Sequence, residues 1–167
     1  HQIKLPNEKF VLSSGHAGLA LYVVNEKYYG IPAQQAFEHH GVHPDKCNQC
    51  HIYCSTGSLG QGLPIAVGMA LANKKNNIYC LISDGECSEG SIWEALRIKE
   101  EQKLNNLKVY LNFNGWAAYK QTHLNFLPKV ENERLTGFKD FPFLQSQDAH
   151  YHTMSEEEYK DAQNILR

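Results

Sequence analysis

The stretch Ile78-Tyr79-Cys80-Leu81-Ile82-Ser83-Asp84-Gly85 decides the fold, because it is a short apolar run that ends abruptly in a turn. Asn76-Asn77 precede the run, so residues 78–83 are predicted to form a β-strand. The spacing of apolar residues predicts a helix over 89–104, and a second apolar run predicts a strand over 107–113. A strand, a helix and a strand in this order form a βαβ unit with parallel strands and a right-handed crossover. The sequence therefore predicts an α/β domain with a parallel sheet flanked by helices.

Further helices are predicted on both sides of this unit. Pro32 stands in the first turn of one of them, and Gly41 is its stop signal. Ser155 and Glu158 have the spacing of a capping box at the start of the last helix. Between Tyr119 and that last helix the patterns are weak. The predicted helices cover 17–24 (beginning near Ser14 or Gly15), 32–40, 64–75 and 155–166, and 41–56 is predicted to be a loop.

Length and composition suit one domain covering residues 1–167. Hydrophobic residues make up 42% of the 167 residues and charged residues 20%, which is enough to form a packed core. The net charge of −2 argues against nucleic acid and membrane surfaces as partners, since both attract basic proteins. No apolar run approaches the roughly 20 residues of a membrane span. The chain starts at His1 without a visible secretory signal, so we expect a cytoplasmic protein.

Five cysteines are an odd number, which favours reduced thiols over a disulfide framework. Cys80 lies inside the apolar run 78–82 and is expected to be buried and inert. The segment Cys47-Asn48-Gln49-Cys50-His51 matches the pattern of c-type haem attachment, and His43 and Cys54 would extend it to a zinc set. A labile disulfide is a further alternative. A loop with incidental thiols is the favoured interpretation.

A metal site is predicted where the two strands of the βαβ unit end. Asp84-Gly85 follows the first strand and Asn114-Gly115 follows the second, one crossover later. Ligands of open α/β sheets bind at the carboxyl ends of the strands. A carboxylate, an amide carbonyl and a nearby backbone carbonyl are hard oxygen ligands, which suit Mg²⁺ or Ca²⁺ rather than zinc. Either dipeptide alone is typical of a simple turn, but the pair at this spacing favours a site.

A glycine-rich segment leads directly into the predicted helix at 64–75. Residues 55–62 read Ser-Thr-Gly-Ser-Leu-Gly-Gln-Gly, and glycines allow backbone N–H groups to approach phosphate oxygens. The N-terminus of the following helix adds a favourable dipole. The segment is neither a Walker A loop nor a dinucleotide fingerprint. Opposite a metal site it predicts a Mg²⁺-diphosphate site.

Three ordered motifs closely resemble the thiamine diphosphate-binding (PP-type) domain of transketolases. They are the segments 10–17 (Phe-Val-Leu-Ser-Ser-Gly-His-Ala), 55–69, and 83–90 (Ser-Asp-Gly-Glu-Cys-Ser-Glu-Gly) with Trp93-Glu94-Ala95. The stretch from Asp84 to Asn114 resembles the thiamine diphosphate motif of that superfamily. The resemblance covers about residues 10–119.

The resemblance implies a role for each matching residue. Asp84 and Asn114 would bind Mg²⁺ through their side chains and Trp116 through its backbone carbonyl, with Ca²⁺ or Mn²⁺ able to substitute. These three would thereby bind the cofactor as well. The other residues implied to lie at the cofactor are His16, Gly57, Ser58, Leu59, Gly85 and Glu86.

Histidines are implied to act on the substrate, since imidazole transfers protons near neutral pH. His16 would lie near the cofactor and the donor sugar. His43, in His43-Pro44-Asp45, resembles the substrate-contacting histidine of the family's His-Pro-Glu segment. His152 or His150 resembles a late active-site histidine. The implied catalytic residues are His16, His43 and His152.

The implied activity is the transfer of a two-carbon ketol unit between sugars, with sugar phosphates as substrates. Glu89 and Glu94 match acidic residues at the interface with a second copy of the chain. The pyrimidine-binding domain, which supplies the glutamate that activates the cofactor, has no counterpart here. We therefore expect a partner chain, a C-terminal pyrimidine-binding transketolase subunit, and no activity without it.

The chain also departs from the family pattern. It lacks an upstream helix and a Ser-Gly-His segment, and residues 117–149 look too short and irregular for the α/β structure expected after the second strand. These departures indicate a shortened domain, a split subunit or a fragment. The alternative from another class is a non-catalytic scaffold or regulatory module. The intact set of Asp84, Asn114 and His16 favours the catalytic interpretation.

Overall fold

The computed structural model describes residues 7–123, 128, 130, 132–135, 141–144 and 152–165. Its strands are β1 (Lys9–Leu12), β2 (Ile78–Ser83), β3 (Leu107–Phe113) and β4 (Asn132–Leu135). Its α-helices are α1 (Gly18–Tyr29), α2 (Ala33–His40), α3 (Gly62–Ala72), α4 (Gly90–Glu101) and α5 (Glu156–Ile165). Single 3-10 turns form η1 (Gly15–Ala17), η2 (Gly85–Ser88) and η4 (Pro142–Leu144).

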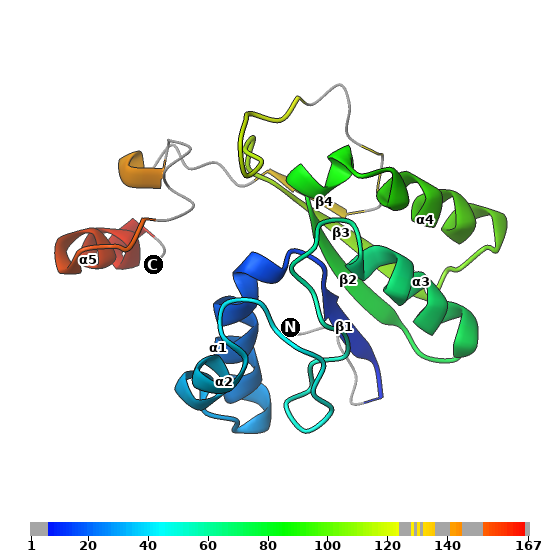
Figure 1. Cartoon of the computed structure of the whole chain (residues 1–167), viewed down its shortest axis with the longest axis horizontal. Helices are drawn as coiled ribbons and strands as arrows, with labels where there is room; N and C mark the ends of the chain where they lie inside the picture. The colour runs from blue at the N-terminus through cyan, green and yellow to red at the C-terminus, as the bar shows by residue number, and fades with distance from the viewer. Residues whose placement is uncertain are drawn as a thin grey trace.

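The four strands form one parallel sheet in the order β1-β2-β3-β4. Ile78 pairs with Leu107 and Ser83 with Asn112, so β2 and β3 end at the same edge of the sheet. The helix α4 connects these two strands, which confirms the predicted βαβ unit. Figure 1 shows α3 and α4 on one side of the sheet, and α1 and α2 beside β1 on the other. The predicted class, a parallel sheet flanked by helices, is confirmed.

The two faces of the sheet bury separate clusters, because side chains alternate along a strand. Val11 points to the face covered by α3 and α4, where Leu63 and Ile92 belong to the same buried cluster. The next residue, Leu12, points to the other face and packs with Leu21 of α1. β1 therefore contributes to both clusters, and this holds the segment that follows it firmly against the sheet.

Most predicted elements are confirmed, with differences at the helix ends. Strands β2 and β3 have the predicted bounds. The helix α2 ends at His40 and is followed by Gly41, whose φ of 72° is favourable only for glycine among common residues. The helix expected at 17–24 is a 3-10 turn followed by α1, which continues to Tyr29. α3 begins two residues before Pro64, and α4 ends at Glu101 because Lys103 adopts a positive φ of 51°.

Two strands were missing from the sequence prediction. β1 is only four residues long and β4 contains Asn, Glu and Arg, so neither has the apolar run that identifies a central strand. β4 lies within residues 117–149, where the sequence pattern is weak, and it pairs parallel to β3 from Tyr110 to Phe113. A strand at the edge can be short and polar, since one of its sides has no strand partner.

The C-terminal helix is confirmed as predicted. Ser155 Oγ accepts a hydrogen bond from the Glu158 backbone N–H at 3.3 Å, and Glu158 Oε2 accepts one from the Ser155 N–H at 2.7 Å. This reciprocal pair is the predicted capping box. In Figure 1, α5 stands apart from the sheet, at the left of the view. A search of the described residues found no helix with the length and apolarity that crossing a membrane requires.

Candidate cofactor site at the carboxyl ends of the strands

Asp84 directly follows β2, and its side chain is buried against the turn that follows β3. Its carboxylate oxygen Oδ2 accepts hydrogen bonds from the Gly115 backbone N–H at 2.9 Å and from Thr122 Oγ1 at 2.5 Å. The chain after β3 turns back on itself here, with Trp116 bridged to Gln121. We call Asp84, Asn114, Gly115, Trp116 and Thr122 the Asp84 corner.

The other two predicted metal ligands lie in this corner. Asn114 Oδ1 accepts a hydrogen bond from the Trp116 backbone N–H at 2.8 Å, which fixes the orientation of the amide. A Cβ atom built on Gly85 would lie 3.9 Å from the Trp116 carbonyl oxygen and 3.3 Å from Ala117. The turn after β3 therefore lies directly against the turn after β2, and only a small residue fits at position 85.

Glu86 lies two residues further on and is fully buried. Its Oε1 accepts hydrogen bonds from Ser13 Oγ at 2.6 Å and from the Gly60 N–H at 3.0 Å. Its Oε2 accepts one from the Ser83 N–H at 3.1 Å. These bonds join the chain after β1, the glycine-rich segment and the end of β2, and we call Ser13, Gly60, Ser83 and Glu86 the Glu86 brace. Burial raises the pKa of Glu86, and the hydrogen bonds from its three partners oppose that rise.

The glycine-rich segment is packed too closely for side chains at several positions. A Cβ on Gly62 would lie 2.5 Å from Ser13 Oγ, and one on Gly60, whose φ is +79°, would lie 2.5 Å from Ser91 Oγ. Ser91 Oγ donates a hydrogen bond to the Gly60 carbonyl at 2.8 Å. The backbone of this segment is thus held between the residues that follow β1 and the first turn of α4.

Two buried polar atoms at this end of the sheet lack a hydrogen-bond partner among the described residues. They are Asp84 Oδ1 and Thr56 Oγ1, and Asp84 is only 2% exposed. Buried polar atoms are nearly always satisfied, so a carboxylate oxygen left open indicates a position for a ligand. A carboxylate oxygen beside an amide and a backbone carbonyl is a donor set that fits Mg²⁺. The residues present therefore fit the predicted metal-diphosphate group.

The structure brings His16 and His43 to the glycine-rich segment. His16 is exposed and follows Gly15, on which a Cβ would lie 2.5 Å from the Gly57 nitrogen. Two ring atoms of His43, Cγ and Cδ2, lie 3.1 and 3.2 Å from the position of a Cβ on Gly57. Ser58 is exposed and Leu59 half-buried in the same segment. The roles implied for these residues remain predictions.

His152 lies elsewhere. Its Nε2 is 2.9 Å from Glu158 Oε2, and its ring centre is 5.7 Å from that of Phe143. Hydrogen bonds from Ser155 and His152 lower the pKa of Glu158. No contact recorded for the described residues joins His152 to the Asp84 corner. His150 lies outside the described residues.

The two predicted interface residues flank the start of α4. Glu89 and Glu94 are both exposed, and Trp93 between them is 44% exposed despite its large apolar ring. The Trp93 Nε1 donates a hydrogen bond to the Cys87 carbonyl at 2.9 Å, which fixes the indole. The role of Glu89 and Glu94 at an interface remains a prediction.

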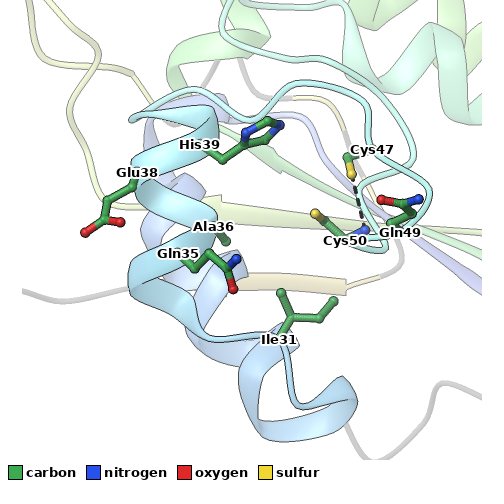
Figure 2. Close-up of a pocket in the computed structure, with 8 residues that line it drawn as sticks. All are labelled: Ile31, Gln35, Ala36, Glu38, His39, Cys47, Gln49 and Cys50. Atoms are coloured by element: carbon green, nitrogen blue, oxygen red, sulfur yellow. Dashed lines mark hydrogen bonds between the residues drawn. The ribbon is translucent and has the colours of Figure 1, made fainter.

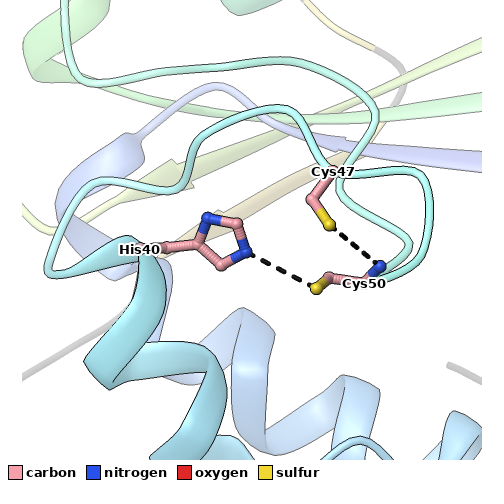
Figure 3. A group of neighbouring side chains, drawn as sticks. All are labelled: His40, Cys47 and Cys50. Atoms are coloured by element: carbon pink, nitrogen blue, oxygen red, sulfur yellow. Dashed lines mark hydrogen bonds between the residues drawn. The ribbon is translucent and has the colours of Figure 1, made fainter.

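A second group of functional side chains lies in the cysteine loop, residues 47–52. The backbone of Cys47 and Ile52 exchanges two hydrogen bonds of 2.9 Å, which close a tight turn. His51 stacks on Tyr29 with ring centres 3.6 Å apart, and it does not belong to the group of ligand atoms that contains the two thiols. Figure 2 shows Cys47 and Cys50 beside a hollow next to α2. The histidine that approaches these thiols is His40, at the end of α2 (Figure 3).

The thiols differ in their surroundings. Hydrogen bonds from Cys50 lower the pKa of Cys47, while burial and the bond to Cys47 raise that of Cys50 to about 11. Burial raises the pKa of Cys54 to about 11 and that of Cys87 to about 12. All five cysteines are free, and Cys80 is fully buried as expected. Cys54 belongs to the core. Among the described residues the ligand atoms that gather within 4.8 Å are those of His40, Cys47 and Cys50, so the structure does not bring His43 and Cys54 into a set with them.

Three residues of these sites were not assigned from sequence. Thr122 lies where the sequence pattern is weak, and Ser13 belongs to a motif whose resemblance assigns it no role. His40 ends a predicted helix, which assigns it no chemical role. For Ser13 and Thr122 the missing information is tertiary, since each pairs with a carboxylate at least 38 positions away. The spacing of His40 to Cys47 and Cys50 was the only local signal available.

The chain belongs to the family described as the thiamine diphosphate binding domain of transketolase, whose model matches residues 4–134. The transketolase of Pongo abelii is 39% identical over 142 residues, which make up 79% of this chain and 23% of that protein. The 6-deoxy-6-sulfo-D-fructose transketolase subunit SqwG of Clostridium sp. (strain MSTE9) is 38% identical over 117 residues, 64% of this chain and 42% of that subunit.

A solved structure shows the same architecture. The transketolase of Campylobacter jejuni subsp. jejuni NCTC 11168 superimposes with a TM-score of 0.61 and 28% identity, over 68% of this chain and 21% of that one. This chain therefore spans less than half the length of each of these relatives. Membership of the family supports thiamine diphosphate as the cofactor.

Proposed function

We propose that this chain binds the Mg²⁺-diphosphate part of thiamine diphosphate and contributes it to a transketolase that moves a two-carbon ketol unit between sugars, with sugar phosphates as substrates. The observation that carries the proposal is the open, buried oxygen Oδ1 of Asp84 at the carboxyl ends of β2 and β3. Family membership supports thiamine diphosphate as the cofactor, and this open oxygen supports a metal at the carboxyl ends of the strands.

The Asp84 corner would hold the metal through three oxygen atoms. Asp84 Oδ1 is open, Asn114 Oδ1 keeps a second lone pair beside its bond to Trp116, and the Trp116 carbonyl is the third. Thr122 and Gly115 hold the other oxygen of Asp84 in place, so the open one keeps its direction. Ca²⁺ or Mn²⁺, which take the same oxygen ligands, would substitute.

The glycine-rich segment would bind the diphosphate. Gly57, Ser58 and Leu59 precede α3, whose N-terminus favours anions. The buried Thr56 hydroxyl, which has no hydrogen-bond partner in the described part of the chain, would be a further donor at this position. Glu86 would support diphosphate binding indirectly. Its carboxylate accepts a hydrogen bond from the Gly60 N–H and so fixes the backbone of the glycine-rich segment.

Thiamine diphosphate held at this position would supply the nucleophile for transfer of the ketol unit. His16 and His43 lie beside the glycine-rich segment and would exchange protons with sugar hydroxyls. The late histidine of the family, which His152 resembles, would come to the site only through a movement of the C-terminal segment or through assembly.

Activity would require a C-terminal pyrimidine-binding subunit and a second copy of this chain. The exposed face of α4 around Trp93, with Glu89 and Glu94 on either side, is the surface we assign to that second copy. The subunit SqwG, which is named as one subunit of a transketolase, is a precedent for such a division. The five free thiols agree with a reducing compartment, so we propose the cytoplasm as the location.

Isothermal titration of thiamine diphosphate into the full chain tests the proposal. The titration is run with Mg²⁺ and with EDTA, alone and with a candidate pyrimidine-binding subunit. Binding that requires Mg²⁺ and becomes tighter with the partner is expected. Absence of binding under every condition would contradict the proposal and favour a non-catalytic module that keeps the fold.

A further inference from the structure

Three metal-binding side chains meet where α2 ends against the cysteine loop. His40 is the last residue of α2, and Cys47 and Cys50 lie on the tight turn that follows. Their ligand atoms all lie within 4.8 Å of one another. Figure 3 shows the imidazole and both sulfur atoms directed into the same space.

The distances match those of a zinc site. His40 Nε2 lies 3.5 Å from Cys50 Sγ. With bonds of about 2.3 Å to sulfur and about 2.0 Å to nitrogen, two such ligands of a tetrahedral Zn²⁺ ion are about 3.5 Å apart. Thiolate and imidazole ligands also select zinc over the hard cations expected at the Asp84 corner. We propose that His40, Cys47 and Cys50 bind one Zn²⁺ ion, separate from the cofactor site.

The ligands are held in place before any metal binds. The two hydrogen bonds between Cys47 and Ile52 fix the turn, and Asn25 Nδ2 of α1 donates to the Cys50 carbonyl at 2.8 Å. The Cys50 backbone N–H points at Cys47 Sγ, 3.3 Å away. Such N–H donors stabilise a thiolate, which is the form of cysteine that binds zinc. Binding would release the thiol protons to solvent.

The fourth ligand would be water. The hollow beside the two sulfur atoms has a volume of about 540 Å³ and is also lined by Glu38 and His39 (Figure 2). It is large enough for solvent to reach the metal from that side. The ion would then have three protein ligands and one exchangeable position.

The location gives the ion a structural consequence. The chain continues from the cysteine loop to Thr56. The Thr56 N–H donates a hydrogen bond to the Pro44 carbonyl at 3.2 Å, next to His43. Ser55 Oγ accepts a hydrogen bond from the Lys46 N–H at 2.8 Å in the same region. Zinc would therefore tie α2 to the segment that leads into the glycine-rich loop, and would raise the stability of that segment.

Cobalt substitution of the full chain, reduced and without oxygen, tests the site. One Co²⁺ per chain should give a thiolate-to-cobalt charge-transfer absorption and the visible bands of a tetrahedral ion, and Zn²⁺ should displace it. Cys47→Ser, Cys50→Ser and His40→Gln should each abolish or strongly shift these bands. Cys54→Ala and His39→Gln are the matched controls and should keep them.

Further measurements separate this site from the Asp84 corner. Addition of Mg²⁺ and thiamine diphosphate should leave the cobalt bands unchanged, and Zn²⁺ should raise the melting temperature of the wild type but not of His40→Gln. The proposal is overturned if the reduced wild-type chain binds no metal. It is also overturned if the bands persist in His40→Gln, or if oxidation to a Cys47–Cys50 disulfide is the only reaction of this loop.

Discussion

The Asp84 corner and the Glu86 brace contain two buried carboxylates only two residues apart, and they are used in opposite ways. Both oxygens of Glu86 accept hydrogen bonds from the protein, including the backbone N–H groups of Gly60 and Ser83. Asp84 has one oxygen satisfied by Gly115 and Thr122, and the other has no partner among the described residues. The two carboxylates are similarly buried, but only Glu86 accepts hydrogen bonds from the described residues at both of its oxygens.

This difference separates a residue that serves the fold from one that serves a ligand. A saturated carboxylate holds neighbouring segments together and has no free lone pair directed at a cofactor. A buried carboxylate oxygen without a hydrogen-bond partner destabilises the fold unless a ligand binds it. This destabilisation is therefore offset only when the protein has bound its metal and cofactor. Substitutions in the two regions should therefore separate stability from cofactor binding.

The largest effect is expected for Asp84→Asn. The amide oxygen can keep the bonds from Gly115 and Thr122, while the NH₂ group replaces the open oxygen and cannot bind a cation. Mg²⁺-dependent binding of thiamine diphosphate should be lost, with the free energy of unfolding of the unloaded chain unchanged or higher. Titration calorimetry and urea denaturation measure the two quantities. An unaltered affinity would remove Asp84 from the metal site.

Glu86→Gln should give the reverse result. Either orientation of the amide places its NH₂ group against a backbone N–H, at Gly60 or at Ser83. One buried N–H then loses its acceptor, and we expect a loss of about 3 kcal/mol in the free energy of unfolding. Chemical denaturation checks this value. Full stability combined with lost binding would show that Glu86 contacts the cofactor directly.

Thr122→Val should have a smaller effect on the Asp84 corner. It removes the donor to Asp84 Oδ2 and keeps the shape of the side chain. Loss of such a supporting bond typically lowers metal affinity about tenfold, equivalent to about 1.4 kcal/mol. Thr122→Ser keeps the hydroxyl and is the matched control. Equal affinities for Val and Ser variants in a Mg²⁺ titration at fixed cofactor would contradict this role.

The smallest effect is a pH dependence of stability. Burial raises the pKa of Glu86 above its ordinary value of 4.5 in the folded chain. Its contribution to stability is then complete below pH 4.5 and is lost as the pH rises through the folded pKa. As the pH rises through that interval, the free energy of unfolding of the wild type should fall relative to that of Glu86→Gln. The difference between the two free energies is therefore larger at low pH. Parallel stability profiles of the two proteins would contradict the prediction.

The central part of the fold was predictable because its signals are local. The apolar runs of β2 and β3, the turns after them and the capping box at Ser155 each depend on neighbouring residues. β4 was not predictable, since a polar edge strand is defined by its pairing with β3. The candidate metal ligands followed from the βαβ spacing. The functions of Ser13, Thr122 and His40 depend on contacts across the fold, which no local pattern contains.

The central claim is that Asp84 Oδ1 is left open for a metal whereas Glu86 is committed to the protein. A crystal structure of the assembled enzyme with thiamine diphosphate and Mn²⁺, using the anomalous signal of manganese, tests it most directly. We predict a manganese ion bonded to Asp84 Oδ1, with Glu86 still bonded to Ser13 and Gly60. A manganese ion bonded to Glu86, or a diphosphate site without Asp84, would contradict the account.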